Sequence, residues 1–179
     1  KISTWSNDPT SDPPSEVLFL YDLDSEQLWS PQNLLSSQRQ RRVEHRPGES
    51  IFYVIENDID SETSISVDWN QPIKTIRLKL HNRSSKIRRL RVTYCVETVM
   101  GVNRESTTLH QHSSKLTGEN AIVMRNGYQA EFPSQIAFLA SRQSGCRFTG
   151  DRTEFLDPFG SYHHPAGAVC RLSNTSGAA

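Results

Sequence analysis

The chain has 179 residues, and its 20 Lys and Arg balance its 20 Asp and Glu, so the formal net charge is zero. This length suits one domain or a part of one. The balanced charge argues against nucleic acid or an anionic membrane surface as a partner, and no apolar run approaches the roughly 20 residues of a membrane span.

Residues 17–21 are apolar, as are two of the three residues 27–29, and the stretch between them is largely polar, which predicts a strand, a turn and a second strand. Residues 51–55 are apolar at every position, which is typical of a strand covered on two faces. In residues 64–69, Ile, Val and Trp alternate with Ser and Asp. We therefore expect an amphipathic strand there, with Trp69 pointing into the core.

The period-two pattern is clearest in the middle of the chain. Residues 76–81 and 89–97 alternate between apolar and polar side chains, and the turn-forming stretch 82–86 separates them. We expect these two strands to form an antiparallel hairpin in the same sheet as residues 64–69. Residues 136–140 predict another buried strand. Because helical periodicity is weak and turn residues recur, the sequence predicts an all-β fold, an antiparallel β-sandwich.

The three cysteines, Cys95, Cys146 and Cys170, are odd in number, widely spaced and without a CxxC pair. This excludes a full disulfide framework and favours a reducing compartment, so we expect a cytoplasmic location. Cys95 lies in an apolar run, which suggests a small buried hydrophobe. The opening residue is not Met, and we expect the chain to be a piece of a longer polypeptide.

Several polar groups admit two interpretations. His110 and His112 could present two imidazoles to a metal ion from one side of a strand, but further ligands at zinc-like spacing are missing, so surface histidines are favoured and no metal site is predicted. Asp151 and Glu154 could be paired carboxylates for glycoside chemistry, or simply an ion pair with Arg152 between them.

Two basic clusters, residues 39–42 and 88–91, lack interleaved aromatic residues, which favours a solvated face over a nucleic-acid site. Trp5 and Trp29 are either core residues or sugar-stacking platforms, and the sequence leaves this open. No combination of nucleophile, base and orienting group is evident, so no catalytic residue is predicted.

Several segments, read in order, resemble one known family. The succession is similar to the N-terminal supersandwich domain of the family ninety-four glycoside phosphorylases, formerly glycosyltransferase family thirty-six. The cyclic β-1,2-glucan synthases and β-1,2-oligoglucan phosphorylases are the nearest look-alikes. The segments that carry the resemblance are residues 5–14, 17–22, 28–31, 76–84, 90–97, 101–105 and 149–156.

The resemblance implies a galactose-mutarotase-like supersandwich, of which residues 1–179 would form a single, incomplete domain. In such enzymes inorganic phosphate attacks the anomeric carbon while an Asp of a separate (α/α) barrel protonates the leaving oxygen. That barrel has no counterpart in this chain, which we therefore expect to be inactive alone. No cofactor is implied, because phosphate is a substrate of the parent enzyme.

The resemblance also implies partners: a β-glucan or oligosaccharide, the barrel of the parent chain, and a second copy in a homodimer. Nucleic acid is not expected, nor is membrane contact by this segment, although a parent of the synthase type would be anchored in the inner membrane. The segment matching a sugar-proximal loop is residues 103–115, where Arg104, His110, Gln111 and His112 could bind sugar hydroxyls.

Two alternatives remain at this stage. Residues 103–115 could be a polar connection that binds no ligand. The whole chain could be a stand-alone carbohydrate-binding or protein-interaction module with a sandwich fold.

Overall fold

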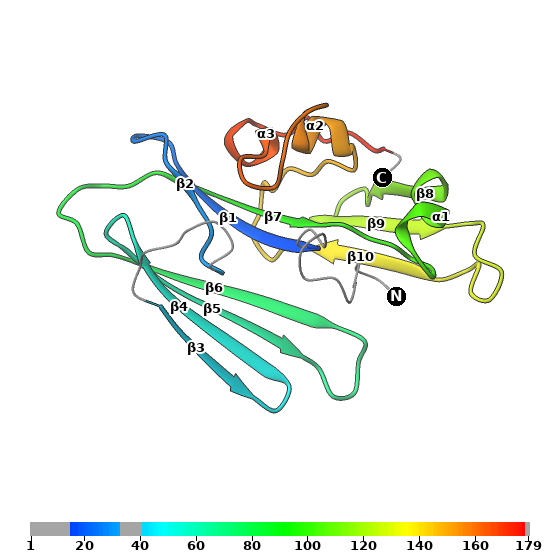
Figure 1. The fold of residues 1–179 in the computed structure, drawn as a ribbon, viewed down its shortest axis with the longest axis horizontal. Coiled ribbons are helices and arrows are strands. Elements are labelled where there is room, and N and C mark those ends of the chain that lie inside the picture. The colour runs from blue at the N-terminus through cyan, green and yellow to red at the C-terminus, as the bar shows by residue number, and fades with distance from the viewer. Residues whose placement is uncertain (1–14, 33–40, 178–179) are drawn as a thin grey trace. The chain divides into compact units, whose positions relative to one another are not determined.

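The computed structural model describes residues 15–32 and 41–177, so the predictions for Trp5 and for basic residues 39–40 lie outside the described part. Most regular structure there is antiparallel strand and the helices are short, which confirms the all-β fold class (Figure 1). The strands are β1 Glu16–Asp22, β2 Leu28–Trp29, β3 Arg41–Arg46, β4 Glu49–Glu56, β5 Ile59–Val67, β6 Lys74–Asn82, β7 Leu90–Val96, β8 Gln111–Lys115, β9 Ala121–Asn126 and β10 Ile136–Ala140. The helices are α1 Arg104–Thr107, the 3₁₀ helix η1 Thr108–His110, α2 Arg152–Leu156 and α3 Ala166–Val169.

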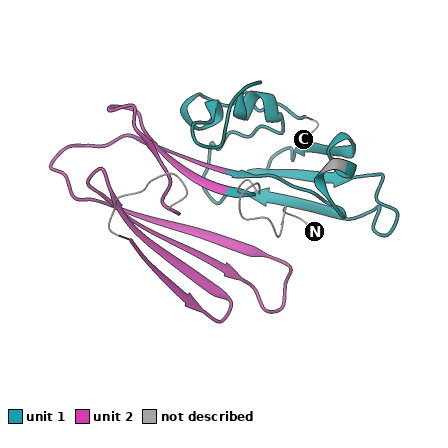
Figure 2. Ribbon diagram, in the orientation of Figure 1, with its two compact units in different colours: residues 1–16, 95–179 teal, residues 17–94 magenta. Residues whose placement is uncertain are grey.

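The chain forms two compact units, coloured separately in Figure 2. Unit 2 is the continuous segment Val17–Tyr94. Unit 1 combines Lys1–Glu16 with Cys95–Ala179.

Unit 2 contains an antiparallel sheet in the order β3-β4-β5-β6, with each strand next to its neighbour in sequence. The two-residue turn between β4 and β5 places Asn57 and Asp58 at φ of 50° and 59°. Two consecutive positive φ angles define the turn whose twist suits a two-residue hairpin, and Asn and Asp tolerate this conformation better than other side chains. The pairing of β5 with β6 confirms that residues 64–67 and 76–81 share a sheet.

A second sheet in unit 2 has the order β2-β1-β7. Leu20, Trp29 and Leu90 from this sheet pack with Ile59 and Leu78 from β5 and β6. The two sheets of the unit therefore share a hydrophobic core, as a sandwich requires. Trp29 is 1% exposed, so of the two interpretations of this residue the structure supports the core one.

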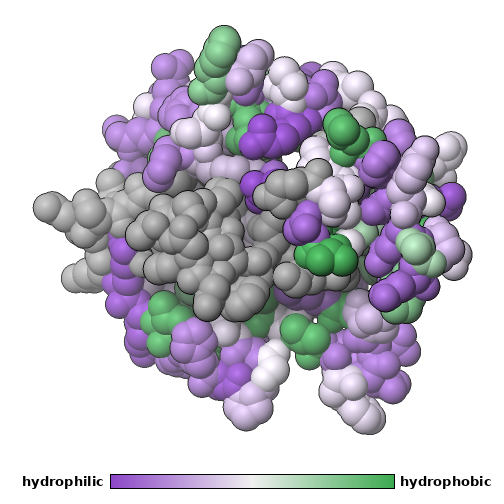
Figure 3. Space-filling model, turned by 45° about the vertical axis from the view of Figure 1, so that its right-hand side comes forward, coloured by the Kyte–Doolittle hydropathy of each residue, from purple (hydrophilic) through white to green (hydrophobic). Residues whose placement is uncertain are grey.

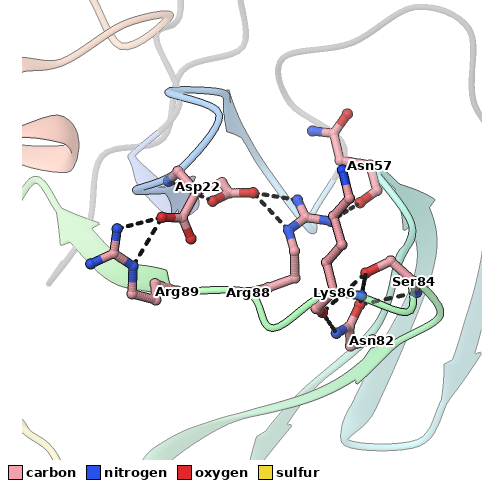
Figure 4. Close-up of polar contacts among 8 residues, drawn as sticks. Asp22, Asn57, Asn82, Ser84, Lys86, Arg88 and Arg89 are labelled. Atoms are coloured by element: carbon pink, nitrogen blue, oxygen red, sulfur yellow. Dashed lines mark hydrogen bonds and ion pairs between the residues drawn. The ribbon is translucent and has the colours of Figure 1, made fainter.

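The predicted hairpin between residues 76–81 and 89–97 is wrong. β6 pairs with β5, whereas β7 lies beside β1 in the other sheet. The connection is tied to β1, because the Leu23 amide donates to the Arg89 carbonyl and the Arg88 guanidinium forms an ion pair with Asp22. Arg88 Nη1 also donates to the Asn57 carbonyl at 2.7 Å (Figure 4). These long-range contacts direct the chain onto β1, and alternation alone does not reveal them.

The prediction that Trp69 lies in the core is also wrong, since this residue is 95% exposed. β5 ends at Val67, and Asp68 opens a turn by accepting hydrogen bonds from the amides of Asn70 and Gln71 at 2.8 and 2.9 Å. An Asx turn of this kind ends the strand pattern. Trp69 is therefore at the tip of the turn and no longer follows the parity of the strand.

Unit 1 contains a sheet in the order β10-β9-β8. The strand predicted at residues 136–140 is present as β10, but the expectation that it is buried is wrong. β10 is an edge strand, and Ile136 and Phe138, two residues apart, are 53% and 54% exposed. Only Ala137, on the opposite face, is fully buried, so β10 buries one of its two faces.

No helix in the described part of the chain is long and apolar enough to cross a bilayer. Most of the residues that Figure 3 colours are hydrophilic or intermediate, and the hydrophobic ones form small separate patches.

Candidate functional site

The candidate site in unit 1 is built around the carboxylate of Glu97, which follows β7. Arg104 Nη2 lies 3.0 Å from Glu97 Oε2, and Arg152 Nε lies 3.5 Å from Glu97 Oε1. The Tyr162 hydroxyl donates a hydrogen bond to Glu97 Oε2. Glu97, Arg104 and Arg152 come from three of the segments that carry the family resemblance, so the fold brings those segments together at one carboxylate.

Burial of the cluster affects its titratable neighbours. Burial, the hydrogen bond to Glu97 and the nearby negative charge all raise the pKa of Tyr162, which therefore stays a neutral donor. Burial, with the charge of Glu97 adding to it, raises the pKa of the Cys95 thiol to about 12. Cys95 is a free thiol that remains protonated at neutral pH, so it is not a nucleophile. The cluster is thus suited to fixing Arg104 in place.

Arg104 begins α1, and local hydrogen bonds define this start of the 103–115 segment. Asn103 is the N-cap residue, and its side chain accepts from the Ser106 amide at 2.9 Å. The Thr107 hydroxyl donates to the Asn103 carbonyl at 2.8 Å and the Thr108 hydroxyl to the Arg104 carbonyl at 2.7 Å. Short polar side chains commonly stabilise helix ends in this way.

The buried side chain of Gln111 anchors residues 103–115 through hydrogen bonds. It is 1% exposed, accepts from the Thr98 hydroxyl at 2.6 Å, and donates to the Thr98 carbonyl at 3.0 Å and the Thr107 hydroxyl at 3.4 Å. All of its amide groups therefore have protein partners. In this structure Gln111 positions the segment, whereas Arg104, His110 and His112 have surfaces that solvent reaches.

His110 and His112 do not form a pair on one strand, because His110 ends η1 and His112 lies in β8. The imidazole of His110 stacks on the ring of Tyr128, with centroids 4.0 Å apart and planes 26° apart. His112 is exposed and lies opposite Arg125 of β9. Nowhere in residues 15–32 and 41–177 do three or more His, Cys, Asp or Glu side chains gather as metal ligands.

The carboxylates near Arg152 have structural partners. Asp151 caps α2 by accepting from the amides of Thr153 and Glu154. Glu154 accepts from the Thr149 hydroxyl, the Ser173 amide and the Thr175 hydroxyl. Although burial opposes the effect, these hydrogen bonds hold the pKa of Glu154 below its usual value. Arg152 pairs with Glu97, so the expected local ion pair with Asp151 or Glu154 is wrong.

Comparison with known proteins defines the class. The family described as Glycosyl hydrolase 94, supersandwich domain, matches residues 1–179, so the chain belongs to this family. It is similar to the cyclic beta-(1,2)-glucan synthase NdvB of Rhizobium meliloti (strain 1021), with 30% identity over 171 residues. This alignment covers 94% of the chain but 6% of the synthase, so the chain spans a small part of that relative's length. The resemblance seen in the sequence is confirmed.

Sequence reasoning found Arg104 and the segment around it but missed four residues of the site, namely Glu97, Arg152, Tyr162 and Tyr128. Glu97 and Arg152 were recognised as parts of motifs, yet nothing in the sequence shows that they meet. Tyr128 follows Asn126 and Gly127, which indicates only a turn. Its position opposite the predicted segment depends on the pairing of β8 with β9, and neither strand was predicted.

Proposed function

We propose that this chain is the non-catalytic sandwich portion of a larger carbohydrate-active enzyme of the glycoside phosphorylase or cyclic β-1,2-glucan synthase type. In that enzyme it supports the catalytic barrel and a homodimer, and residues 103–115 contact the glucan. The observation that carries the proposal is the family match over the whole chain, combined with an alignment that covers 6% of a glucan synthase.

The arrangement of the carboxylates supports a non-catalytic role. An acid catalyst needs a carboxyl group that can reach the glycosidic oxygen and exchange its proton. Glu97 is held by two guanidiniums and a phenol, Asp151 by a helix N-terminus, and Glu154 by hydroxyls and an amide. These groups act as fixed acceptors.

The chemistry of residues 103–115 supports contact with a sugar. Arg104 offers several N–H donors in a planar fork, and its ion pair with Glu97 fixes the orientation of that fork. Exposed His112 adds a further donor or acceptor. Donors held in place before binding lose little conformational freedom when a sugar hydroxyl arrives.

The test compares Arg104→Ala, His112→Ala and Arg152→Ala in the full-length enzyme. Arg152 is the matched control, because it also pairs with Glu97 but lies on α2, outside the segment. We expect Arg104→Ala to raise the KM for the acceptor sugar by roughly tenfold, the value of one charge-assisted hydrogen bond, and His112→Ala to raise it less. The KM for the donor should not change in either variant.

Equal effects of Arg104→Ala and Arg152→Ala on the acceptor KM would mean that Arg104 only supports Glu97, and residues 103–115 would then be a connection without a ligand. If the reading frame that encodes this chain lacks a helical barrel with an acid Asp, the stand-alone binding or interaction module becomes the better proposal.

A further inference from the structure

From the ring pair in unit 1 we infer that Tyr128 is a sugar-stacking residue that receives one pyranose ring of the glucan next to residues 103–115. This inference rests on the proposed function and adds a contact to it. The evidence lies in the exposure of the ring, in the groups that hold it and in the polar side chains around it.

Tyr128 is an exposed aromatic residue whose ring is supported by a neighbouring side chain. It is 79% exposed, yet one face of its ring is stacked on His110. The imidazole therefore supports the phenol ring from one side and leaves the other face to solvent. Phe159, also in unit 1, is fully exposed, and no stacked partner is seen for it in the described part of the chain.

Two buried amides fix the position of this ring pair. Asn126 is 3% exposed, accepts from the Tyr128 amide at 3.1 Å and donates to the Met100 carbonyl at 3.1 Å. In the β8–β9 ladder Asn126 lies opposite Gln111, which is bonded to Thr98. His110 directly precedes Gln111, and Tyr128 lies two residues after Asn126. Both rings are therefore close in sequence to Gln111 and Asn126, two buried residues whose side chains are hydrogen-bonded to the backbone.

A pyranose matches such a surface. Its C–H groups form an apolar patch that suits an aromatic face, while its hydroxyls point outward from the ring edge. Exposed polar residues lie close by in the chain, because His112 and Arg125 form the ladder pair next to Gln111 and Asn126 and both are exposed. An apolar face with polar residues close by in the chain favours a neutral, hydroxyl-rich ligand.

The test measures the acceptor KM of the full-length enzyme, with the β-1,2-linked disaccharide sophorose as the probe, for Tyr128→Ala, Tyr128→Leu and Tyr128→Phe. We expect Tyr128→Ala to raise KM by roughly five- to tenfold, the effect of leaving one sugar face in water. Tyr128→Phe keeps the ring and should stay within about twofold of wild type, whereas Tyr128→Leu should resemble Tyr128→Ala because it lacks a flat face. Phe159→Ala is the control and should leave KM unchanged.

Thermal unfolding of each variant separates binding from folding. A ring that only clamps the turn would lower the melting temperature without changing KM, and that result would overturn the inference. If Tyr128→Ala fails to fold, the difference between Tyr128→Phe and Tyr128→Leu decides the question, and equal KM values for these two would overturn it. Failure of the proposed function looks different, because Arg104→Ala would then match Arg152→Ala, or sophorose would not act as an acceptor of the wild-type enzyme.

Discussion

At the scale of single residues, buried polar groups rather than apolar ones decide where the irregular segments lie. Arg88 reaches Asp22 and the Asn57 carbonyl and so directs the chain away from β6. Gln111 does the same for residues 103–115 through Thr98 and Thr107. Desolvated polar groups must find partners, so such contacts select one conformation among many.

Asp22 should make stability depend on pH. Burial alone would raise its pKa, but hydrogen bonds from the Asp24 amide, Arg88 and Ser25 outweigh burial and lower it. A carboxyl with a lowered pKa in the folded state stabilises the fold fully above its unfolded-state value of about 4, and this contribution is lost as the pH falls through the folded-state pKa. We expect Asp22→Asn to cost about 2 kcal/mol of unfolding free energy at pH 7, and less as the pH drops below about 4.

Urea unfolding between pH 3 and pH 7 measures this difference. Asp24→Asn serves as the comparison, since Asp24 forms an exposed pair with Arg89, and it should change stability little at any pH. A constant difference between wild type and Asp22→Asn across that range would show that the charge of Asp22 does not contribute.

Gln111→Ala should loosen residues 103–115. The substitution leaves the Thr98 hydroxyl and carbonyl without their partner, which costs about 1 to 3 kcal/mol. Hydrogen exchange should show faster amide exchange in residues 103–115, with β4 and β5 unaffected. His112→Ala, at an exposed position next in sequence, should leave the exchange pattern as in wild type, and similar exchange in both variants would contradict the anchoring role of Gln111.

At the scale of elements, the sequence identifies strands better than their partners. The apolar runs in residues 17–21 and 51–55 and the alternation in residues 64–69 and 76–81 are local patterns, and β1, β4, β5 and β6 appear where they predict them. The neighbour of β7 and the exposed face of β10 depend on contacts distant in sequence, which no local pattern records. β8 was missed because all of its residues are polar, and β9 was missed although residues 121–124 form an apolar run.

The two tryptophans of unit 2 provide a test of the sandwich core. Trp29→Ala removes a fully buried ring between β2 and its neighbours and should cost about 3 to 5 kcal/mol. Trp69→Ala changes the same residue type at an exposed turn and should cost less than about 0.5 kcal/mol. The midpoints of chemical unfolding compare the two variants directly, and equal losses would show that the buried ring of Trp29 contributes no more to stability than the exposed ring of Trp69.

At the scale of the whole molecule, the family membership and the all-β fold were accessible from the sequence, because ordered motifs and alternation extend along the chain. The site was accessible only in part. Arg104 lies in a recognisable motif and pairs with Glu97 after β7, whereas the other groups that hold Glu97 come from α2 and from the segment before α3 and meet it only after folding.

A prediction at this scale concerns activity. Because the structural roles of Glu97, Asp151 and Glu154 leave these carboxylates fixed, we expect the 179-residue chain alone to release no phosphate from α-glucose 1-phosphate and an acceptor sugar. The full-length enzyme under the same conditions is the positive control. Phosphate release by the chain that persists after purification to homogeneity would contradict the non-catalytic role.

The sharing of one carboxylate by two guanidiniums also has an evolutionary consequence. A lineage that replaces Glu97 with a neutral side chain leaves two like charges beside each other, with nothing between them to offset their repulsion. Positions 97, 104 and 152 should therefore covary among relatives. Where the carboxylate at position 97 is absent, we expect the arginine at position 104 or 152 to be replaced as well.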